Sequence, residues 1–258
     1  MLSAVALNMQ QHPGKSQAWP VGPSNSDLSS DRVDVWRVQL DEPLSTVSTS
    51  SILSSDELTR ASHFHFEKDR QHFVRCRSAL RFLLSGYLGI PAAEIRFEYQ
   101  PSGKPEVTAQ QKPRQLRFNV SHSGGVALIA VGENHRIGID IEKIRPEVDI
   151  TALAERFFSV RERAGLRALP DHLRVAAFFA CWTRKESFLK ATGEGLSFPL
   201  ADFSVTTHPD FDPTLEEIRG NTEARKQWFL ADLSVAAGYR ATVAVESGFS
   251  HLETYTQT

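Results

Sequence analysis

Residues 178–196, FFACWTRKESFLKATGEGL, place an acid between two lysines in a helical pattern that stops at a glycine. One face of this helix carries, at three- and four-residue spacing, Phe179, Trp182, Glu186 and Leu189. A carboxylate on an apolar face needs a cation nearby. Lys190, one turn after Glu186, could supply it, and so could a metal ion if other acids converge there. Gly193 and Gly195 predict the end of the helix and a turn of the chain.

The composition is that of an ordinary soluble protein. With 258 residues, 41% hydrophobic and 23% charged, the chain can form one large domain or two lobes of roughly 100 to 130 residues. Its 29 Lys and Arg residues nearly balance its 31 Asp and Glu residues, which gives a net charge of -2. This balance removes the usual electrostatic reason to expect nucleic acid or an anionic membrane as the main partner.

Cysteine usage and the start of the chain predict a cytoplasmic protein. Cys76 and Cys181 both lie in helical patterns, which favours reduced, buried thiols over a disulfide, and two cysteines do not make a zinc site. The first residues lack the basic start and long apolar run of a secretory signal, and no later segment approaches a membrane span. Residues 1–32 are rich in Ser, Pro, Gly and Gln and are expected to form a flexible tail.

The first half of the chain predicts a strand, two helices and a further strand. The expected ranges are 33–40, about 54–63, 68–87 and 94–99, followed by a PSGKP turn at 101–105. The second helix carries a line of basic residues on one face, namely Arg70, Arg77 and Arg81. Such a line could bind phosphates. The alternative interpretation is a solvated helix face.

The segment 116–131 predicts two short strands joined by a loop of Ser and Gly. The strands are expected at 116–120 and 126–131, with SHSGG at 121–125 between them. Ser121, His122 and unhindered backbone N–H groups would give this loop the donors that a phosphate or an oxyanion needs. Loops of Ser and Gly also simply turn chains, and this alternative stays open.

The next strand presents two acids on one face. In IGIDIEKIRP, residues 137–146, the isoleucines are expected in the core, while Gly138, Asp140 and Glu142 share the opposite face. Alternate Cα atoms of a strand are about 7 Å apart, so both carboxylates could reach one hard cation, and the glycine would leave room for a ligand. The alternative is an ordinary half-exposed strand, unless a third ligand is present. Glu186 is the candidate for that ligand.

The second half repeats the order of elements in the first. Helical runs are expected at 150–169 and 173–192 and strands at 227–233 and 239–245, with a frayed end to the chain. A helix, a glycine, a proline-containing turn and a strand occur in RSALRFLLSGYLGIPAAEIRFEY, and again in RKESFLKATGEGLSFPLADFSV. This suggests a duplicated unit with a boundary at 133–136. A ligand site between the two lobes would then draw on both halves.

Five motifs, in this order, resemble those of the 4'-phosphopantetheinyl transferases. They are GKP at 103–105, FNVSHS at 118–123, GIDIE at 138–142, RFFS at 156–159 and WTRKESFLKATGEGL at 182–196. The resemblance covers about 33–245 and is to the large, surfactin-synthetase-activating type. It implies an α+β fold of two similar, pseudo-twofold related lobes, each a small, mostly antiparallel sheet packed with helices. We therefore expect an N-terminal lobe at 33–134, a C-terminal lobe with the metal site at 135–248, and tails at 1–32 and 249–258.

The resemblance also implies an activity. Members of this family transfer the 4'-phosphopantetheine group of coenzyme A to a serine of an apo acyl, peptidyl or aryl carrier protein, and release adenosine 3',5'-bisphosphate. The implied cofactor is Mg²⁺, with Mn²⁺ as the alternative. Because the two-lobed type holds both halves of the site in one chain, we expect a monomer whose partners are coenzyme A and a carrier protein, not nucleic acid or a membrane.

The same resemblance assigns roles to matching residues. Asp140, Glu142 and Glu186 match the acids that bind the magnesium ion, and Glu186 is the candidate base, directly or through a water, for the carrier serine. Lys185 and Lys190 match helix lysines that contact phosphate, and Lys190 would stabilise the leaving group. The remaining residues matched to coenzyme A contacts are Arg60, Lys104, Ser121 and His122, together with Arg77 and Arg81 in an R-x-x-x-R pattern of some members.

Two departures and three alternatives accompany this resemblance. The serine-rich stretch at 45–55 and the tail before Val33 have no clear counterpart in the family. Glu57 stands where the best-known members carry a second basic residue, which implies a weaker grip on the 3'-phosphate or another residue in its place. A catalytically silent homologue that binds coenzyme A or carrier proteins is disfavoured because all three acids and both lysines are present. A metal-dependent phosphohydrolase would need a two-metal or histidine-rich cluster. A nucleic-acid-binding regulator would need a basic face.

Overall fold

The structure is a computed structural model that describes residues 19–23, 28–42, 51–101, 103–111, 115–195 and 198–257. The parts of the expected tail at 1–18 and 24–27, and of the serine-rich stretch at 45–50, lie outside these residues. No helix within the described ranges is long and apolar enough to cross a membrane.

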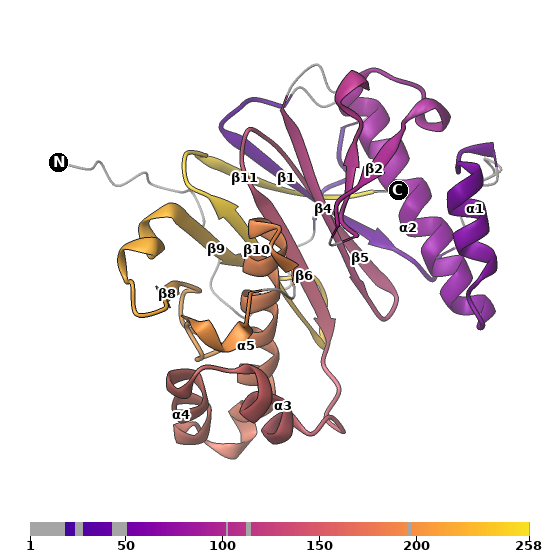
Figure 1. Ribbon diagram of the computed structural model, residues 1–258. Helices are drawn as coiled ribbons and strands as arrows, with labels where there is room; N and C mark the ends of the chain where they lie inside the picture. Colours follow the sequence, from indigo (N-terminus) through magenta and orange to yellow (C-terminus); the bar gives the residue numbers. More distant parts are fainter. Residues whose placement is uncertain are drawn as a thin grey trace.

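In the N-terminal lobe the long helix α2 (Glu67–Leu88) packs against one face of a sheet, and the short helix α1 (Ser55–Ser62) packs on α2 (Figure 1). Its sequence patterns give the expected helices, because Ser54 precedes the first and Gly89, with φ 66°, ends the second. The expected strand at 94–99 is shorter, since its first residue belongs to a 3₁₀ turn. In chain order the elements are β1 (Arg32–Gln39), α1 (Ser55–Ser62), α2 (Glu67–Leu88), η2 (Ala92–Glu94), β2 (Phe97–Tyr99), β3 (Pro105–Val107), η3 (Ala109–Gln111), β4 (Leu116–Ser123) and β5 (Val126–Glu133).

In the C-terminal lobe the long helix α5 (Asp171–Thr192) packs against a second sheet, on the side away from α1 and α2 (Figure 1). Two shorter helices, α3 (Ile150–Phe157) and α4 (Val160–Ala168), pack against α5. Ser159 separates the two helical runs expected at 150–169 and caps the second of them. In chain order the elements are β6 (Ile137–Lys143), α3 (Ile150–Phe157), α4 (Val160–Ala168), α5 (Asp171–Thr192), η5 (Leu200–Asp202), β7 (Phe203–Val205), β8 (Leu215–Ile218), η6 (Glu223–Gln227), β9 (Trp228–Asp232) and β10 (Tyr239–Glu246).

The two lobes have the same strand order, which confirms the expected duplication. The N-terminal sheet runs β11-β1-β5-β4, with β11 formed by His251–Thr256, and the C-terminal sheet runs β6-β10-β9. The first strand of each lobe, β1 or β6, pairs antiparallel with the last, β5 or β10. That last strand pairs in turn with β4 or β9. The fold is therefore the expected α+β arrangement of two similar lobes.

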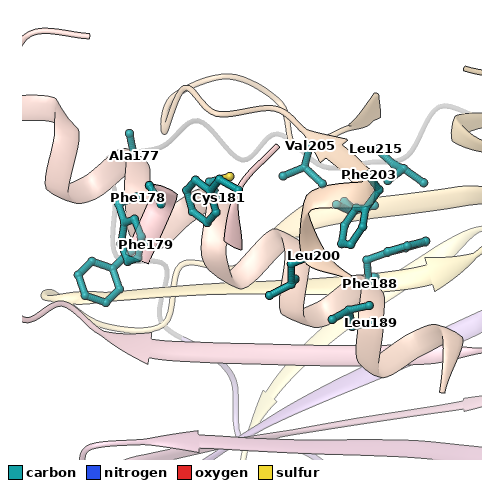
Figure 2. Packing of buried hydrophobic residues seen from close by; sticks show 14 of the residues in the cluster. Ala177, Phe178, Phe179, Cys181, Phe188, Leu189, Leu200, Phe203, Val205 and Leu215 are labelled. Carbon is teal, nitrogen blue, oxygen red and sulfur yellow. The ribbon is translucent and has the colours of Figure 1, made fainter. Parts of the chain in front are cut away.

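Three apolar layers join the helices and sheets. In β1, Val33 and Val35 point into the layer between the two sheets, while Trp36 and Val38 point toward α2. The third layer lies between α5 and the rest of the C-terminal lobe, where Figure 2 shows Phe188 of α5 next to Phe203. Their ring centroids are 4.8 Å apart. Helices cover the outer face of each sheet, so both faces of the strands are buried.

The ends of the chain are held more firmly than the sequence predicts. The expectation of a frayed C-terminal tail is wrong, because β11 pairs in parallel with β1 over six residues and Tyr255 packs on Trp36. Trp19, expected in the flexible tail, is buried and donates a hydrogen bond to the carbonyl of Ser234. Both cysteines are free and buried, as expected, and burial raises the pKa of the Cys76 thiol to about 11.

Each lobe contains a buried ion pair at an equivalent position in its fold. In the C-terminal lobe, Lys185 of α5 donates to both oxygens of Glu162 at 2.7 Å, and Glu162 accepts a hydrogen bond from the backbone of Ser159 at the start of α4. In the N-terminal lobe, Arg81 of α2 donates to Glu57 at 2.7 Å, and Glu57 accepts from the backbone of Ser54 before α1. Arg81 and Lys185 each lie eight residues before the glycine that ends their helix. The pairs are counterparts in a duplicated unit.

Gly138 lets β6 approach the backbone of α5. A Cβ atom at this position would lie 2.0 Å from the carbonyl oxygen of Ser187 and 2.4 Å from the backbone nitrogen of Ala191. The expectation that this glycine leaves room for a ligand is therefore wrong, because the space is filled by the helix itself. Its function is to bring the strand that carries Asp140 and Glu142 against the helix that carries Glu186.

We expect Gly138→Ala to lower the free energy of unfolding by about 3 kcal/mol, because backbone atoms of α5 would have to move. Urea unfolding measures this loss. Gly165→Ala, inside α4, is the matched control, since its new Cβ would meet only the side chain of Thr207 at 3.3 Å. It should change the stability by less than about 1 kcal/mol. Equal stability of the two variants would contradict the contact.

We expect Lys185→Met to lower the free energy of unfolding by about 3 to 5 kcal/mol, because Glu162 would remain buried without its cation. Lys226→Met removes an exposed lysine that pairs with Glu223 three residues earlier, and should cost at most about 1 kcal/mol. Both values come from the same urea titration. A Lys185→Met protein as stable as Lys226→Met would show that the buried pair is not structural.

Candidate functional site

The site is built on β6, whose alternating side chains place two acids on the face toward α5. Asp140 is buried with 4% of its surface exposed, and Glu142 is half-buried nearer the end of the strand. Desolvation is the main cause that raises the pKa of each carboxyl, and the negative charge of Asp140 raises that of Glu142 further. The predicted face of this strand is confirmed, because the three isoleucines that alternate with Gly138, Asp140 and Glu142 pack into the layer between the sheets.

The motif FNVSHS lies on β4, directly beside β6. The expectation that Ser121 to Ser123 form a loop is wrong, because these residues continue β4 and pair with β5 up to Ser123↔Val126. Their backbone groups are therefore used by the sheet, and only Gly124 and Gly125 turn the chain. What the motif offers to the site is side chains, which alternate along the strand.

Three side chains of β4, two residues apart, hold β6 in register. Asn119 accepts a hydrogen bond from the backbone N–H of Ile139 at 2.8 Å. Ser121 donates to Asp140 at 3.0 Å, and Ser123 donates to Glu142 at 2.9 Å. Asn119 and Ser123 had not been assigned a role from the sequence. Their spacing at i, i+2 and i+4 with Ser121 is the signal that identifies them, once the motif is read as a strand.

The helix α5 contributes Glu186 and Lys190, one turn apart. Lys190 lies 2.6 Å from Asp140 Oδ1 and 3.0 Å from the hydroxyl of Ser121, so its anionic partner is Asp140 and not Glu186. Glu186 is half-buried, and desolvation, followed by the charge of Asp140, raises the pKa of its carboxyl. The structure thus brings together the three acids, Lys190 and Ser121 from β4, β6 and α5.

The donors in this cluster suit a hard cation. Asp140 Oδ2 is buried and has no hydrogen-bond partner among the described residues, while the neighbouring carboxylates repel one another. A divalent ion that prefers oxygen ligands would satisfy this oxygen and reduce the repulsion. As they stand, the described side chains do not form a ready group of three or more His, Cys, Asp or Glu ligands. The carboxylate oxygens are suitable ligands for such an ion, but in this structure the described side chains are not arranged around one position.

Lys185, matched to a phosphate contact, is not part of this cluster. Its ammonium group is fully buried, where it binds Glu162 and the carbonyl oxygen of Phe203 at 2.6 Å. The ring of Phe203 lies 4.1 Å from the same nitrogen. All of these contacts are inside the C-terminal lobe, so Lys185 does not reach the surface on which Asp140 and Lys190 lie.

The arginines of the N-terminal lobe divide into exposed and buried ones. Arg60 is exposed and lies over the ring of Phe73. Arg77 packs between aromatic rings with its Nε 3.4 Å from Glu57, and Arg81 is fully buried against Glu57 and the carbonyl oxygens of Ala92 and Ile95. Arg70, at the start of α2, is exposed and pairs with Glu67, so the line of arginines is solvated at its start and buried along the rest of its length. Of the three arginines matched to coenzyme A contacts, Arg60 is exposed to solvent, while Arg77 and Arg81 are held inside the lobe.

His122 and Lys104 both lie near Lys190. His122 is exposed at the end of β4, and desolvation, then the charges of Lys190 and His72, lower its pKa. Lys104, in the GKP turn, donates to the carbonyl oxygens of Lys190 and Ile137 at 2.8 and 3.2 Å. Its bonds in this structure are therefore to the backbone of the other lobe.

Comparison with known proteins agrees with this architecture. A family model described as the 4'-phosphopantetheinyl transferase superfamily matches residues 136–244, and one described as 4'-phosphopantetheinyl transferase, N-terminal, matches residues 36–134. The chain is 44% identical over 180 residues to the 4'-phosphopantetheinyl transferase HetI of Nostoc sp., a match that covers 69% of this chain and 76% of that protein.

A second relative covers more of the chain. The 4'-phosphopantetheinyl transferase Sfp of Bacillus subtilis is 30% identical over 212 residues, which is 81% of this chain and 90% of Sfp. The two family models meet at the boundary between the lobes, and the superfamily model, which matches residues 136–244, contains Asp140, Glu142, Glu186 and Lys190. The chain therefore belongs to the 4'-phosphopantetheinyl transferases, an enzyme family, and within them to the two-lobed type to which Sfp also belongs.

Proposed function

We propose that this protein transfers the 4'-phosphopantetheine group of coenzyme A to a serine hydroxyl of an apo carrier protein, with Mg²⁺ or Mn²⁺, and releases adenosine 3',5'-bisphosphate. The observation that carries the proposal is the cluster of Asp140, Glu142, Glu186 and Lys190 where β6 meets α5. In the reaction, the serine oxygen forms a bond to the β-phosphorus while the bond to the leaving phosphate breaks. This chemistry needs charge neutralisation and positioning more than a covalent intermediate.

Each residue of the cluster has its own proposed role in the reaction. Asp140, Glu142 and Glu186 would hold the metal ion, which when bound would neutralise charge on the pyrophosphate. Glu186 accepts the proton of the serine hydroxyl, a task that its raised pKa favours. Lys190 directs its ammonium group from α5 toward the leaving phosphate. Arg60, His122 and Ser121 bind the nucleotide end of coenzyme A.

We extend the proposal to the setting of the enzyme. The carrier is an acyl, peptidyl or aryl carrier protein, and the enzyme acts as a cytoplasmic monomer. Support for the monomer comes from the site itself, because Asn119, Ser121 and Ser123 of one lobe and the acids of the other already meet within a single chain. Size-exclusion chromatography with light scattering measures the oligomeric state.

Incubation of the purified protein with coenzyme A, MgCl₂ and several apo carrier proteins should add phosphopantetheine to the carrier, detected by intact mass spectrometry. Glu186→Gln should lower kcat by about 10²-fold or more, because both a base and a metal ligand are removed. Glu223→Gln, on an exposed turn, is the matched control and should retain the activity of the native protein.

Other products would identify other functions. Coenzyme A binding without transfer to any carrier would indicate a catalytically silent homologue. Release of inorganic phosphate would indicate a phosphohydrolase. Full turnover by Glu186→Gln with the metal still bound would exclude Glu186 as the base.

The raised pKa of Glu186 also predicts a dependence of stability on pH. The folded protein binds this proton more tightly than the unfolded chain does. The stability that the protonated carboxyl contributes is therefore lost as the pH rises from the ordinary pKa of glutamate through the raised pKa, and the full loss remains at higher pH. Glu186→Gln should therefore be more thermostable than the native protein at pH 8, with a difference that shrinks toward acidic pH. Addition of MgCl₂ at pH 8 should stabilise the native protein more than this variant. A difference in Tm that does not vary with pH would contradict the assigned cause.

A further inference from the structure

Lys104 connects the N-terminal lobe to the two elements that carry the site. It lies in the turn between β2 and β3, which is closed by hydrogen bonds from Gln100 N to Lys104 O at 2.9 Å and from Gly103 N to Gln100 O at 2.8 Å. Gly103 adopts φ 80° in this turn, a conformation that favours glycine. The turn therefore projects the lysine side chain toward the C-terminal lobe from a fixed base.

The two acceptors of Lys104 are backbone carbonyls that would otherwise lack partners. The Lys190 carbonyl is one of the last four of α5, which have no acceptor role within the helix, and a cation is favourable at a helix C-terminus. The Ile137 carbonyl belongs to the edge of β6 that faces β4, the edge on which Ile139 N–H binds Asn119. One ammonium group thus ties the end of α5 and the start of β6 to the N-terminal lobe.

The junction beside Lys104 is not closely packed. A cavity of about 220 Å³ lies beside it between the lobes, with Lys104, Arg117, Ile137 and Thr192 in its lining. Side-chain packing therefore does not close the junction at this point. Desolvation lowers the pKa of Lys104 to about 8, and its two hydrogen bonds go to neutral carbonyls.

We propose that Lys104 is a positioning residue that sets the location of Lys190 through the backbone of α5, and that it does not bind a phosphate of coenzyme A. The side chain of Lys190 is held by Asp140 and Ser121, while its own carbonyl is held by Lys104. Loss of Lys104 frees the last turn of α5 and displaces the ammonium group from the leaving phosphate. The inference rests on the proposed transferase function and deepens it.

The test is steady-state kinetics of Lys104→Met with coenzyme A, MgCl₂ and an apo carrier, together with the Kd of coenzyme A from calorimetry. We expect kcat to fall about 10- to 100-fold, because a displacement of about 1 Å in a catalytic group has an effect of this size. The KM and Kd for coenzyme A should change less than 3-fold. Lys104→Arg, which keeps a donor for the carbonyls, should recover part of kcat. Lys226→Met is the control for loss of a lysine elsewhere.

A second measurement tests the contact between the two lobes and does not depend on catalytic activity. Hydrogen exchange followed by mass spectrometry should show faster exchange in Lys104→Met for peptides that contain the backbone N–H groups of Ile139 and Lys143, which bind Asn119 and Ser123 across the junction. Peptides of α2 should be unchanged. If Met at this position prevents folding, Lys104→Gln, whose amide can reach fewer acceptors, gives the same comparison at a smaller amplitude.

The outcomes separate the two hypotheses. A rise of 10-fold or more in the Kd for coenzyme A with unchanged kcat would overturn the inference and make Lys104 a phosphate ligand. Unchanged kinetics and unchanged exchange would also overturn it. A native protein that transfers nothing to any carrier would contradict the proposed function, while the exchange measurement would still decide whether Lys104 holds the junction.

Discussion

The contact between β6 and α5 is the constraint on which the site depends. Gly138 allows the strand to lie against the helix backbone, at a distance that no side chain would permit. The acids of β6 and the charged residues of α5 therefore face each other across a short, fixed gap, although 46 residues separate Asp140 from Glu186 in the sequence. Because a strand and a helix are both rigid, the geometry of the charges is set by the backbone and not by flexible side chains.

The structure distinguishes charges that stabilise the fold from charges that are available for chemistry. Glu162 with Lys185 is a fully buried pair in which both carboxylate oxygens accept hydrogen bonds within their own lobe. Glu57 is also fully buried and lies between two cations, Arg81 at 2.7 Å from Oε2 and Arg77 at 3.4 Å from Oε1. Asp140 instead keeps one oxygen without a partner, and its cation Lys190 remains partly exposed. A buried carboxylate whose oxygens all have partners gains little electrostatic stabilisation from a ligand. A buried carboxylate with an oxygen that lacks a partner can be stabilised by binding a further cation.

The sequence predicted those features that depend on local pattern. The alternation in IGIDIE predicted the shared face of Asp140 and Glu142, and the positions of glycine and proline predicted both long helices and the duplication. Two errors came from features that local pattern does not encode. Ser and Gly in SHSGG are typical of a loop, but pairing with β5 extends the strand through Ser123. Likewise, the role of Lys185 depends on Glu162, which is 23 residues away and could not be recognised as its partner from spacing alone.

The duplication accounts for Lys185 and Glu57 together. Counted back from the glycine that ends each long helix, Lys185 corresponds to Arg81, and each pairs with a glutamate at the start of a preceding helix, Glu162 or Glu57. Glu57 is thus the N-terminal counterpart of Glu162, and its acidic side chain is the partner that the buried Arg81 requires. By the same count, Glu186 corresponds to Phe82 and Lys190 to Gly86, so the N-terminal lobe has kept the structural pair and lacks the charged residues of the site. The two copies of one fold thus make different contributions: the C-terminal lobe supplies the acids of the site, and the N-terminal lobe supplies β4, whose side chains bind the strand that carries two of them.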